Sequence, residues 1–139
     1  MKRDYKKIIQ IVSFPFVVFV YNQLVNMRFD LYLSFPWLDV PMHLIGGASI
    51  GVSASLLLRY QWERPDWTRV NRFFFLWNIG MVSFAAIVWE FYEFTSDYFF
   101  HTTMQASPAD TVADMFLGLA GGLIGGLCVW FYWRRARKN

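Results

Sequence analysis

The sequence has little charge and almost no cysteine. Asp, Glu, Lys and Arg make up 17% of its 139 residues, whereas a soluble domain usually carries about a quarter. The single cysteine, Cys128, excludes an intramolecular disulfide and any zinc site built on several thiolates. Both shortages argue against an ordinary soluble domain and against a disulfide-bonded scaffold.

Apolar residues fill the place of the missing charge. Hydrophobic residues account for 56% of the chain and aromatic residues for 21%, and an excess of aromatics is typical of membrane proteins. A transmembrane helix needs about 20 mostly apolar residues to cross a hydrocarbon core of about 30 Å. Four segments meet this need, at about 8–27, 40–58, 73–95 and 111–133. No small-residue cleavage site follows the first, so we expect a retained helix there and not a signal peptide.

Short connections separate the four segments, so we expect neighbouring helices to run in opposite directions. The sequence therefore predicts an all-α fold, in which residues 1–139 form a single transmembrane domain. This domain is expected to be an up-down bundle of four helices embedded in the lipid bilayer.

The basic residues fall on one side of this predicted bundle. They precede the first segment, fill the connection between the second and third, and follow the fourth; only Arg28 falls on the other side. By the positive-inside rule, this predicts a multi-pass protein of the plasma (inner) membrane with both termini in the cytoplasm. Because topology accounts for the bases, we expect no nucleic acid partner. The three groups are Lys2, Arg3, Lys6 and Lys7; Arg59, Arg64, Arg69 and Arg72; Arg134, Arg135, Arg137 and Lys138.

Acids and histidines fall on the opposite, outer side. Asp39 and His43 are spaced i, i+4 at the start of the second segment, and Asp110 and Asp114 have the same spacing at the start of the fourth. At about 100° per residue, the acids of the stretch "WEFYEFTSD" share one helix face within about 60° of arc. Ionisable groups in a membrane are costly and face a bundle interior. The acids and histidines of this side are Asp30, Asp39, Glu90, Glu93, Asp97, Asp110, Asp114, His43 and His101.

So many acids with so few bases must bind a cation or share protons. Oxygen ligands with an imidazole suit a divalent metal ion: Mg²⁺, Mn²⁺, Ca²⁺ or Fe²⁺, and Zn²⁺ if His43 takes part. The predicted ligands are Asp39, His43, Glu90, Glu93 and Asp114, with Asp97, Asp110 and His101 as further candidates. The structural alternatives are helix caps for Asp39 and Asp110, a solvated Asp97 and a loop position for His101. No catalytic residue is assigned.

Glycines recur every fourth residue in the second and fourth segments. Small residues at this spacing let two helix backbones approach closely, which predicts contact between these segments and would draw His43 towards Asp114. Homodimerisation through the same glycines is the alternative. The glycines are Gly47, Gly51, Gly118, Gly122 and Gly126.

Three motifs follow one another on successive helices: Asp39-x-x-x-His43, Glu90-x-x-Glu93 and the run "DTVADMFLGLAGG" from Asp110. This set resembles the bacterial integral membrane family typified by YjdF. It is more distantly similar to the VanZ-like family of the cell envelope, which has Gln in place of Glu93 and Asn in place of Asp114. The resemblance implies a small helical membrane protein with an acidic and histidine-containing outer site.

Three functions are compatible with this sequence. The first is an envelope protein whose cation site binds or processes an anionic lipid head group or polyprenyl phosphate. The second is a component of a transporter for protons or divalent cations. The third is a non-catalytic subunit or assembly factor with a membrane protein partner.

Overall fold

The computed structural model describes residues 5–29, 31–61 and 71–136, and these residues contain only helices and their connections. The long helices are α1 (Tyr5–Phe29), α3 (Asp39–Gln61), α4 (Asn71–Phe100) and α5 (Pro108–Ala136). Helix α2 (Leu31–Ser34) and the 3-10 helix η1 (Pro36–Leu38) connect α1 to α3. All four long helices are long and apolar enough to cross a membrane, which confirms the prediction of an all-helical membrane protein. Seven of the charged residues on which the predicted topology and outer site rest lie outside the described residues: Lys2, Arg3, Asp30, Arg64, Arg69, Arg137 and Lys138.

The helices extend beyond the predicted apolar segments. Helix α4 has 30 residues, which at 1.5 Å per residue gives about 45 Å, and it continues five residues past the predicted end at 95. The backbone hydrogen bonds of α4 continue past the last residue of the predicted apolar segment, so Asp97 lies within the last turns of this helix. The helix ends at His101, whose φ of 55° is left-handed and whose N–H donates to the Asp97 carbonyl at 3.1 Å.

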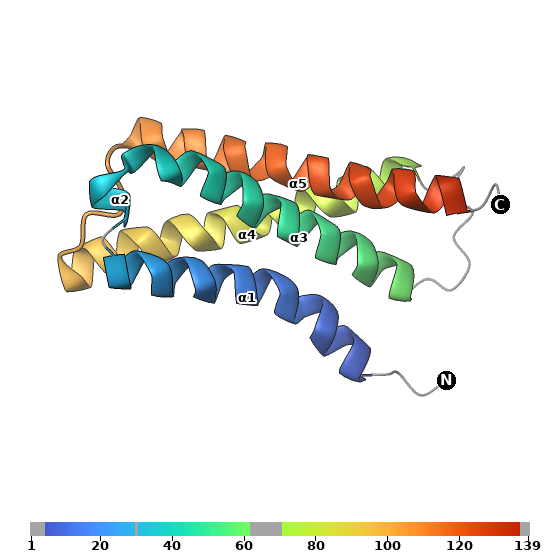
Figure 1. Cartoon of the computed structure of the whole chain (residues 1–139). Helices are drawn as coiled ribbons and strands as arrows, with labels where there is room; N and C mark the ends of the chain where they lie inside the picture. The colour runs from blue at the N-terminus through green and yellow to red at the C-terminus, as the bar shows by residue number, and fades with distance from the viewer. Residues whose placement is uncertain (1–4, 30, 62–70, 137–139) are drawn as a thin grey trace.

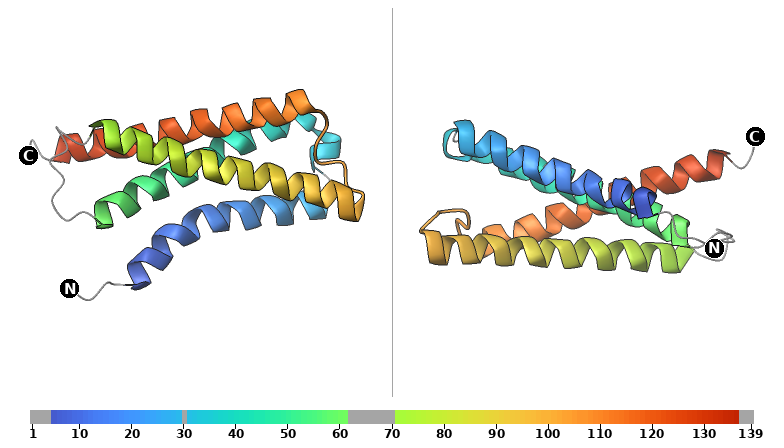
Figure 2. Two further views of the ribbon diagram at one scale, coloured as in Figure 1. Left: turned by 180° about the vertical axis from the view of Figure 1, so that it is seen from behind. Right: turned by 90° about the horizontal axis from the view of Figure 1, so that it is seen from below.

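The two ends of the molecule are formed by different parts of the helices (Figures 1 and 2). At one end lie α2, η1, the start of α3, the end of α4 and the start of α5, and we call this the acidic end. At the other lie the start of α1, the end of α3, the start of α4 and the end of α5, and we call this the basic end. Helices α3 and α5 therefore run in the same direction along the bundle.

Helices α3 and α5 touch through glycine backbones. A Cβ atom on Gly47 would overlap the carbonyl group of Gly118, and one on Gly51 would overlap that of Gly122. Gly126 faces a buried Asn78, whose Oδ1 would lie 3.2 Å from an added Cβ. The five glycines of the predicted pattern thus lie at contacts within the chain: Gly47, Gly51, Gly118, Gly122 and Gly126.

Helix α1 lies on the outside of the bundle and bends along its length (Figure 1). Pro15 interrupts it, and because proline has no N–H, the carbonyl of Ile11 lacks its usual intrahelical donor. The Ser53 hydroxyl of α3 donates to this carbonyl at 2.9 Å. A backbone group freed by a proline is satisfied in this way by a neighbouring helix.

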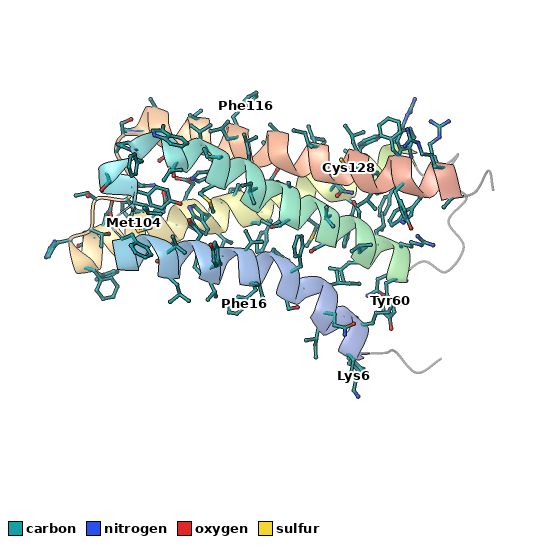
Figure 3. The ribbon with its side chains drawn as sticks, viewed as in Figure 1. Lys6, Phe16, Tyr60, Met104, Phe116 and Cys128 are labelled. Atoms are coloured by element: carbon teal, nitrogen blue, oxygen red, sulfur yellow. The ribbon has the colours of Figure 1, made fainter. Side chains whose placement is uncertain are left out.

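The outward faces of the helices are apolar. Phe16 of α1 and Phe116 of α5 point away from the bundle (Figure 3), with 64% and 70% of their surfaces exposed. Cys128 is also exposed on α5. Such a coat suits contact with lipid chains, which is the environment that four apolar helices require.

Candidate metal centre

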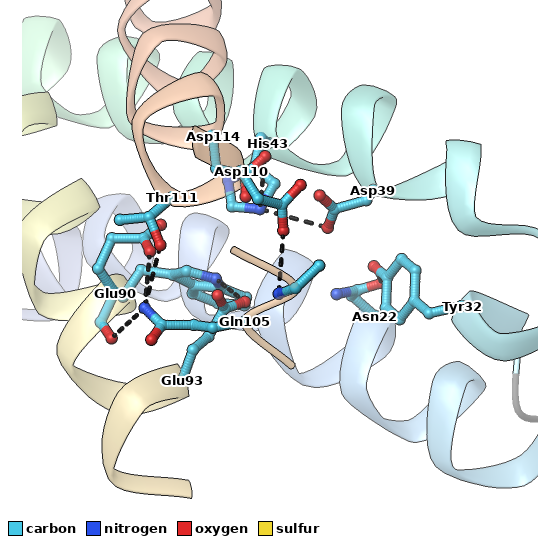
Figure 4. Close-up of polar contacts among 12 residues, drawn as sticks. Asn22, Tyr32, Asp39, His43, Glu90, Glu93, Gln105, Asp110, Thr111 and Asp114 are labelled. Atoms are coloured by element: carbon cyan, nitrogen blue, oxygen red, sulfur yellow. Dashed lines mark hydrogen bonds and ion pairs between the residues drawn. The ribbon is translucent and has the colours of Figure 1, made fainter. Parts of the chain in front are cut away.

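Three side chains from two helices meet at the acidic end. His43 Nε2 lies 3.3 Å from Asp39 Oδ1 and 3.7 Å from Asp114 Oδ1. One ligand atom from each residue lies within 4.8 Å of the others. We call these three residues the Asp–His–Asp group (Figure 4). The side chains of His43 and Asp114 are 11% and 6% exposed, whereas that of Asp39 is 35% exposed.

The glycine contacts of α3 and α5 explain why this group forms. Gly47 lies one helical turn after His43, and Gly118 lies one turn after Asp114. Because these glycines touch and the two helices run in the same direction, the preceding turn of each helix brings His43 and Asp114 to the same level. Asp39 joins them from the turn before His43, since residues four apart share a helix face.

Glu93 lies beside the Asp–His–Asp group and outside it. Its carboxylate is buried and accepts a hydrogen bond from Trp89 Nε1 at 2.7 Å. The Trp89 ring also packs edge-on against the His43 ring, with centroids 6.1 Å apart, and against Phe19 of α1 at 5.1 Å. Trp89 therefore covers His43 from the side of α4 while it holds Glu93.

Glu90 is held by the connection between α4 and α5. Gln105 Nε2 donates to Glu90 Oε2 at 3.2 Å and to Thr111 Oγ1 at 3.2 Å. This single amide joins the end of α4 to the start of α5, and Glu90 is only 7% exposed. The structure thus places Glu90 next to the connection, and it does not bring the carboxylate into the Asp–His–Asp group.

Asp97 and His101, two of the further predicted candidates, lie where α4 meets its connection to α5. Asp97 accepts hydrogen bonds from the Thr102 hydroxyl at 2.5 Å and from the backbone N–H groups of Met104 and Gln105 at 2.8 and 2.9 Å. His101 is exposed and terminates α4. Neither residue belongs to the Asp–His–Asp group.

Neither Asp110 nor Asp39 is the N-cap residue of its helix, although Asp110 Oδ2 accepts from the Ala106 N–H at 3.3 Å just before α5. Helix α5 begins at Pro108, three residues earlier than predicted, and Ser107 Oγ accepts from the Asp110 N–H at 3.1 Å, as an N-cap does. Serine followed by proline is a recognisable helix start. Asp39 has helical backbone angles of −59° and −45°, whereas an N-cap residue is extended. The side chain of Asp39 faces His43 instead.

Sequence reasoning missed Gln105, Trp89 and the pair Tyr32–Asn22. Tyr32 donates from its hydroxyl to Asn22 Oδ1 at 2.6 Å. Burial raises the pKa of Tyr32 to about 12, and the charges of Asp39 and Glu93 act in the same direction. The hydroxyl therefore stays protonated at neutral pH. The polar side chain of Asn22 within an apolar segment could have indicated the Tyr32–Asn22 pair. No feature of the sequence indicated the role of Gln105.

The family described as predicted membrane proteins (DUF2238) matches residues 2–137 of the chain. No curated protein and no solved structure matches it. The family typified by YjdF is this same family, so that resemblance is confirmed, whereas the more distant likeness to the VanZ-like family stays a prediction. The match covers almost the whole chain, and the protein therefore belongs to the DUF2238 family of predicted membrane proteins.

Proposed function

We propose that this protein binds a divalent cation at Asp39, His43 and Asp114, and that the bound cation holds the phosphate of an anionic envelope lipid or polyprenyl phosphate. The observation that carries the proposal is the convergence of one imidazole nitrogen and two carboxylates from α3 and α5. The protein would lie in the plasma membrane as an up-down bundle, with the basic end in the cytoplasm and the cation site near the outer leaflet.

The distances within the Asp–His–Asp group support a cation. Ligand atoms about 2.0–2.2 Å from a tetrahedral zinc ion lie about 3.3–3.6 Å from one another. His43 Nε2 lies 3.3 and 3.7 Å from the two carboxylate oxygens. The three ligand atoms would need to move little to enclose an ion. His43 would bind through Nε2 and carry its proton on Nδ1.

A divalent cation would also balance the charge of the group. In the metal-bound form both carboxylates would be ionised and the imidazole neutral, so that the three side chains would carry a charge of −2, which the ion neutralises. Three protein ligands leave coordination positions open, as in zinc sites that bind substrate. A phosphate would be repelled by the carboxylates alone, so a bridging cation is what allows an anionic head group to bind here.

The surroundings support a lipid ligand. Exposed aromatic residues lie at the acidic end, in η1 and at the end of α4, as expected where a helix bundle leaves the hydrocarbon core. Trp37 is 65% exposed, and Phe99 and Phe100 at the end of α4 are 67% and 77% exposed. An anionic head group at this depth would lie within reach of the open side of the cation.

A cation or proton transporter has less support. Towards the basic end, the buried hydroxyls of Ser49 and Ser53 are used in hydrogen bonds to backbone carbonyls, and beyond them Ser55 Oγ lies 3.0 Å from Asn78 Oδ1. Between this pair and the Asp–His–Asp group, the helices pack closely: a Cβ added to Gly122 would overlap Val82, and one added to Gly51 would overlap the carbonyl group of Gly122. Transport would require these helices to separate, and cation flux into proteoliposomes would be the outcome that favours this alternative.

Metal content tests the proposal directly. Protein purified in mild detergent without chelators is expected to contain a divalent metal ion by elemental analysis, and metal-stripped protein is expected to bind Mn²⁺ or Zn²⁺ in a calorimetric titration. His43→Ala and Asp114→Asn should each weaken binding at least about tenfold, since each removes a ligand. Asp97→Asn is the matched control, because it neutralises an acid of the same end outside the group.

The lipid part needs its own measurement. Retention of a short polyprenyl phosphate is expected to require the metal and to be lost with EDTA and with Asp114→Asn. Metal-free wild-type protein that fails to bind either ion would overturn the whole proposal. Metal binding without metal-dependent retention of the phosphate would overturn its lipid part alone.

A further inference from the structure

The basic end carries bases without acids among the residues that the structure describes. Six bases lie on the ends of the four long helices there: Lys6, Lys7, Arg59, Arg72, Arg134 and Arg135. No Asp or Glu occurs on these helix ends within the described ranges. Among the described residues, the helix ends on this side therefore carry only positive charge.

Two of these arginines are stacked on tryptophan rings. The guanidinium carbon of Arg59, on α3, lies 4.9 Å from the ring centroid of Trp133 on α5. That of Arg134 lies 4.7 Å from the ring of Trp130, one turn earlier on α5. A guanidinium group held over a ring in this way still has N–H groups that can donate to an anion.

The rings under these arginines are fixed by the core. Trp133 is 6% exposed and packs with Leu58 and Phe74, and Trp130 packs against the same cluster. Both arginines are exposed. Each guanidinium group thus rests on an ordered ring with its N–H groups at the surface, so that little side-chain freedom would be lost when an oxyanion binds.

We propose that the Arg59–Trp133 and Arg134–Trp130 pairs form a binding site for the phosphate of an anionic phospholipid in the leaflet that meets the basic end. The planar fork of each guanidinium donates to phosphate oxygens. The tryptophan rings lie at the depth of the head groups, where aromatic side chains of membrane proteins gather. Basic sites between helices at this depth recognise anionic head groups. The site is independent of the cation site at the opposite end.

Lipid retention tests this site. Wild-type protein in mild detergent, mixed with equal amounts of phosphatidylglycerol and phosphatidylcholine, is expected to retain phosphatidylglycerol at least about fivefold more in native mass spectra, corresponding to about 1 kcal/mol. The double variant Arg59→Gln/Arg134→Gln should lose this preference. The double variant Arg59→Lys/Arg134→Lys should lose most of it, because lysine keeps the charge without the stacked planar fork.

Arg135→Gln is the matched control, since it removes a neighbouring positive charge from the same turn of α5 without a ring contact in the described part of the chain. It should keep the preference. An equal loss in Arg135→Gln, or full retention in the lysine variant, would overturn the stacked site and leave only general attraction by positive charge. Inorganic phosphate at millimolar concentration should not displace the lipid, and displacement would mean that the site binds free phosphate instead.

Discussion

The two ends of the bundle handle charge in opposite ways. At the acidic end, Glu90, Glu93 and Asp114 are buried, with exposed fractions of 5–7%, and Glu90 and Glu93 have hydrogen-bond donors from Gln105 and Trp89. At the basic end, Arg59 and Arg134 are exposed and rest on aromatic rings. Burying a charge is costly unless it is paired, whereas a stacked surface arginine keeps its hydration. The acidic end therefore has the less replaceable charges.

The glycine contacts between α3 and α5 connect the two ends. The contact of Gly47 with Gly118 brings His43 and Asp114 close together near the acidic end. Gly126, further along α5, lies beside Asn78. A change in these contacts should affect both ends together, whereas a change at one end should stay local. Substitutions in the glycine contacts are therefore expected to have larger effects than substitutions at one end alone.

Gly47→Ala should have the largest effect. Its Cβ would overlap the backbone carbonyl of Gly118, which cannot yield as a side chain can, so the loss of stability should exceed the value of about 1–3 kcal/mol that is usual for overpacking. Gly46→Ala is the matched control, because nothing lies within 4 Å of an added Cβ there, and alanine favours a helix over glycine by about 1 kcal/mol. Thermal unfolding in detergent should show a lower Tm for Gly47→Ala and an unchanged or higher Tm for Gly46→Ala. Equal Tm values would contradict the close contact.

His43→Leu should come next, with a loss of about 3 kcal/mol measured with chelator present, because it leaves Asp39 and Asp114 facing each other without a base. Adding Asp114→Leu should recover part of this loss, since an apolar replacement of a buried charged set is often tolerated. Chemical denaturation of both variants is the measurement. A double variant no more stable than the single one would mean that the group is not energetically coupled.

The sequence was sufficient to predict an all-helical membrane protein, because the length of an apolar segment is a strong, local signal. Each predicted segment lies inside an observed long helix. The pairing of Asp39, His43 and Asp114 followed from helical spacing and the glycine pattern. The places of Glu90 and Glu93 did not, because they depend on Gln105 in a polar connection and on the rotation of Trp89, and neither has a periodic signature.

Gln105→Ala should have a smaller, local effect at the acidic end. It removes the donor to Glu90 and the link to Thr111, and leaving a buried acceptor without its donor costs about 1–3 kcal/mol. Hydrogen exchange of the backbone between 101 and 107 should speed up, while α3 and α5 at the basic end keep their protection. Thr103→Ala, at an exposed position of the same connection, serves as the control. Faster exchange throughout α5 would show that the connection stabilises the whole bundle.

Arg59→Gln should have the smallest effect on stability, about 0.5–1 kcal/mol, because a cation–π contact at an exposed site is worth no more than this. The Trp133 ring beneath it stays in place through Leu58 and Phe74, so the basic end should keep its packing. Denaturation of Arg59→Gln beside Arg135→Gln, which should lie within about 0.5 kcal/mol of wild type, measures the stacking itself. A loss as large as that of His43→Leu would reverse the comparison, since it would mean that the arginines of the basic end are as firmly built into the fold as the buried acids of the other.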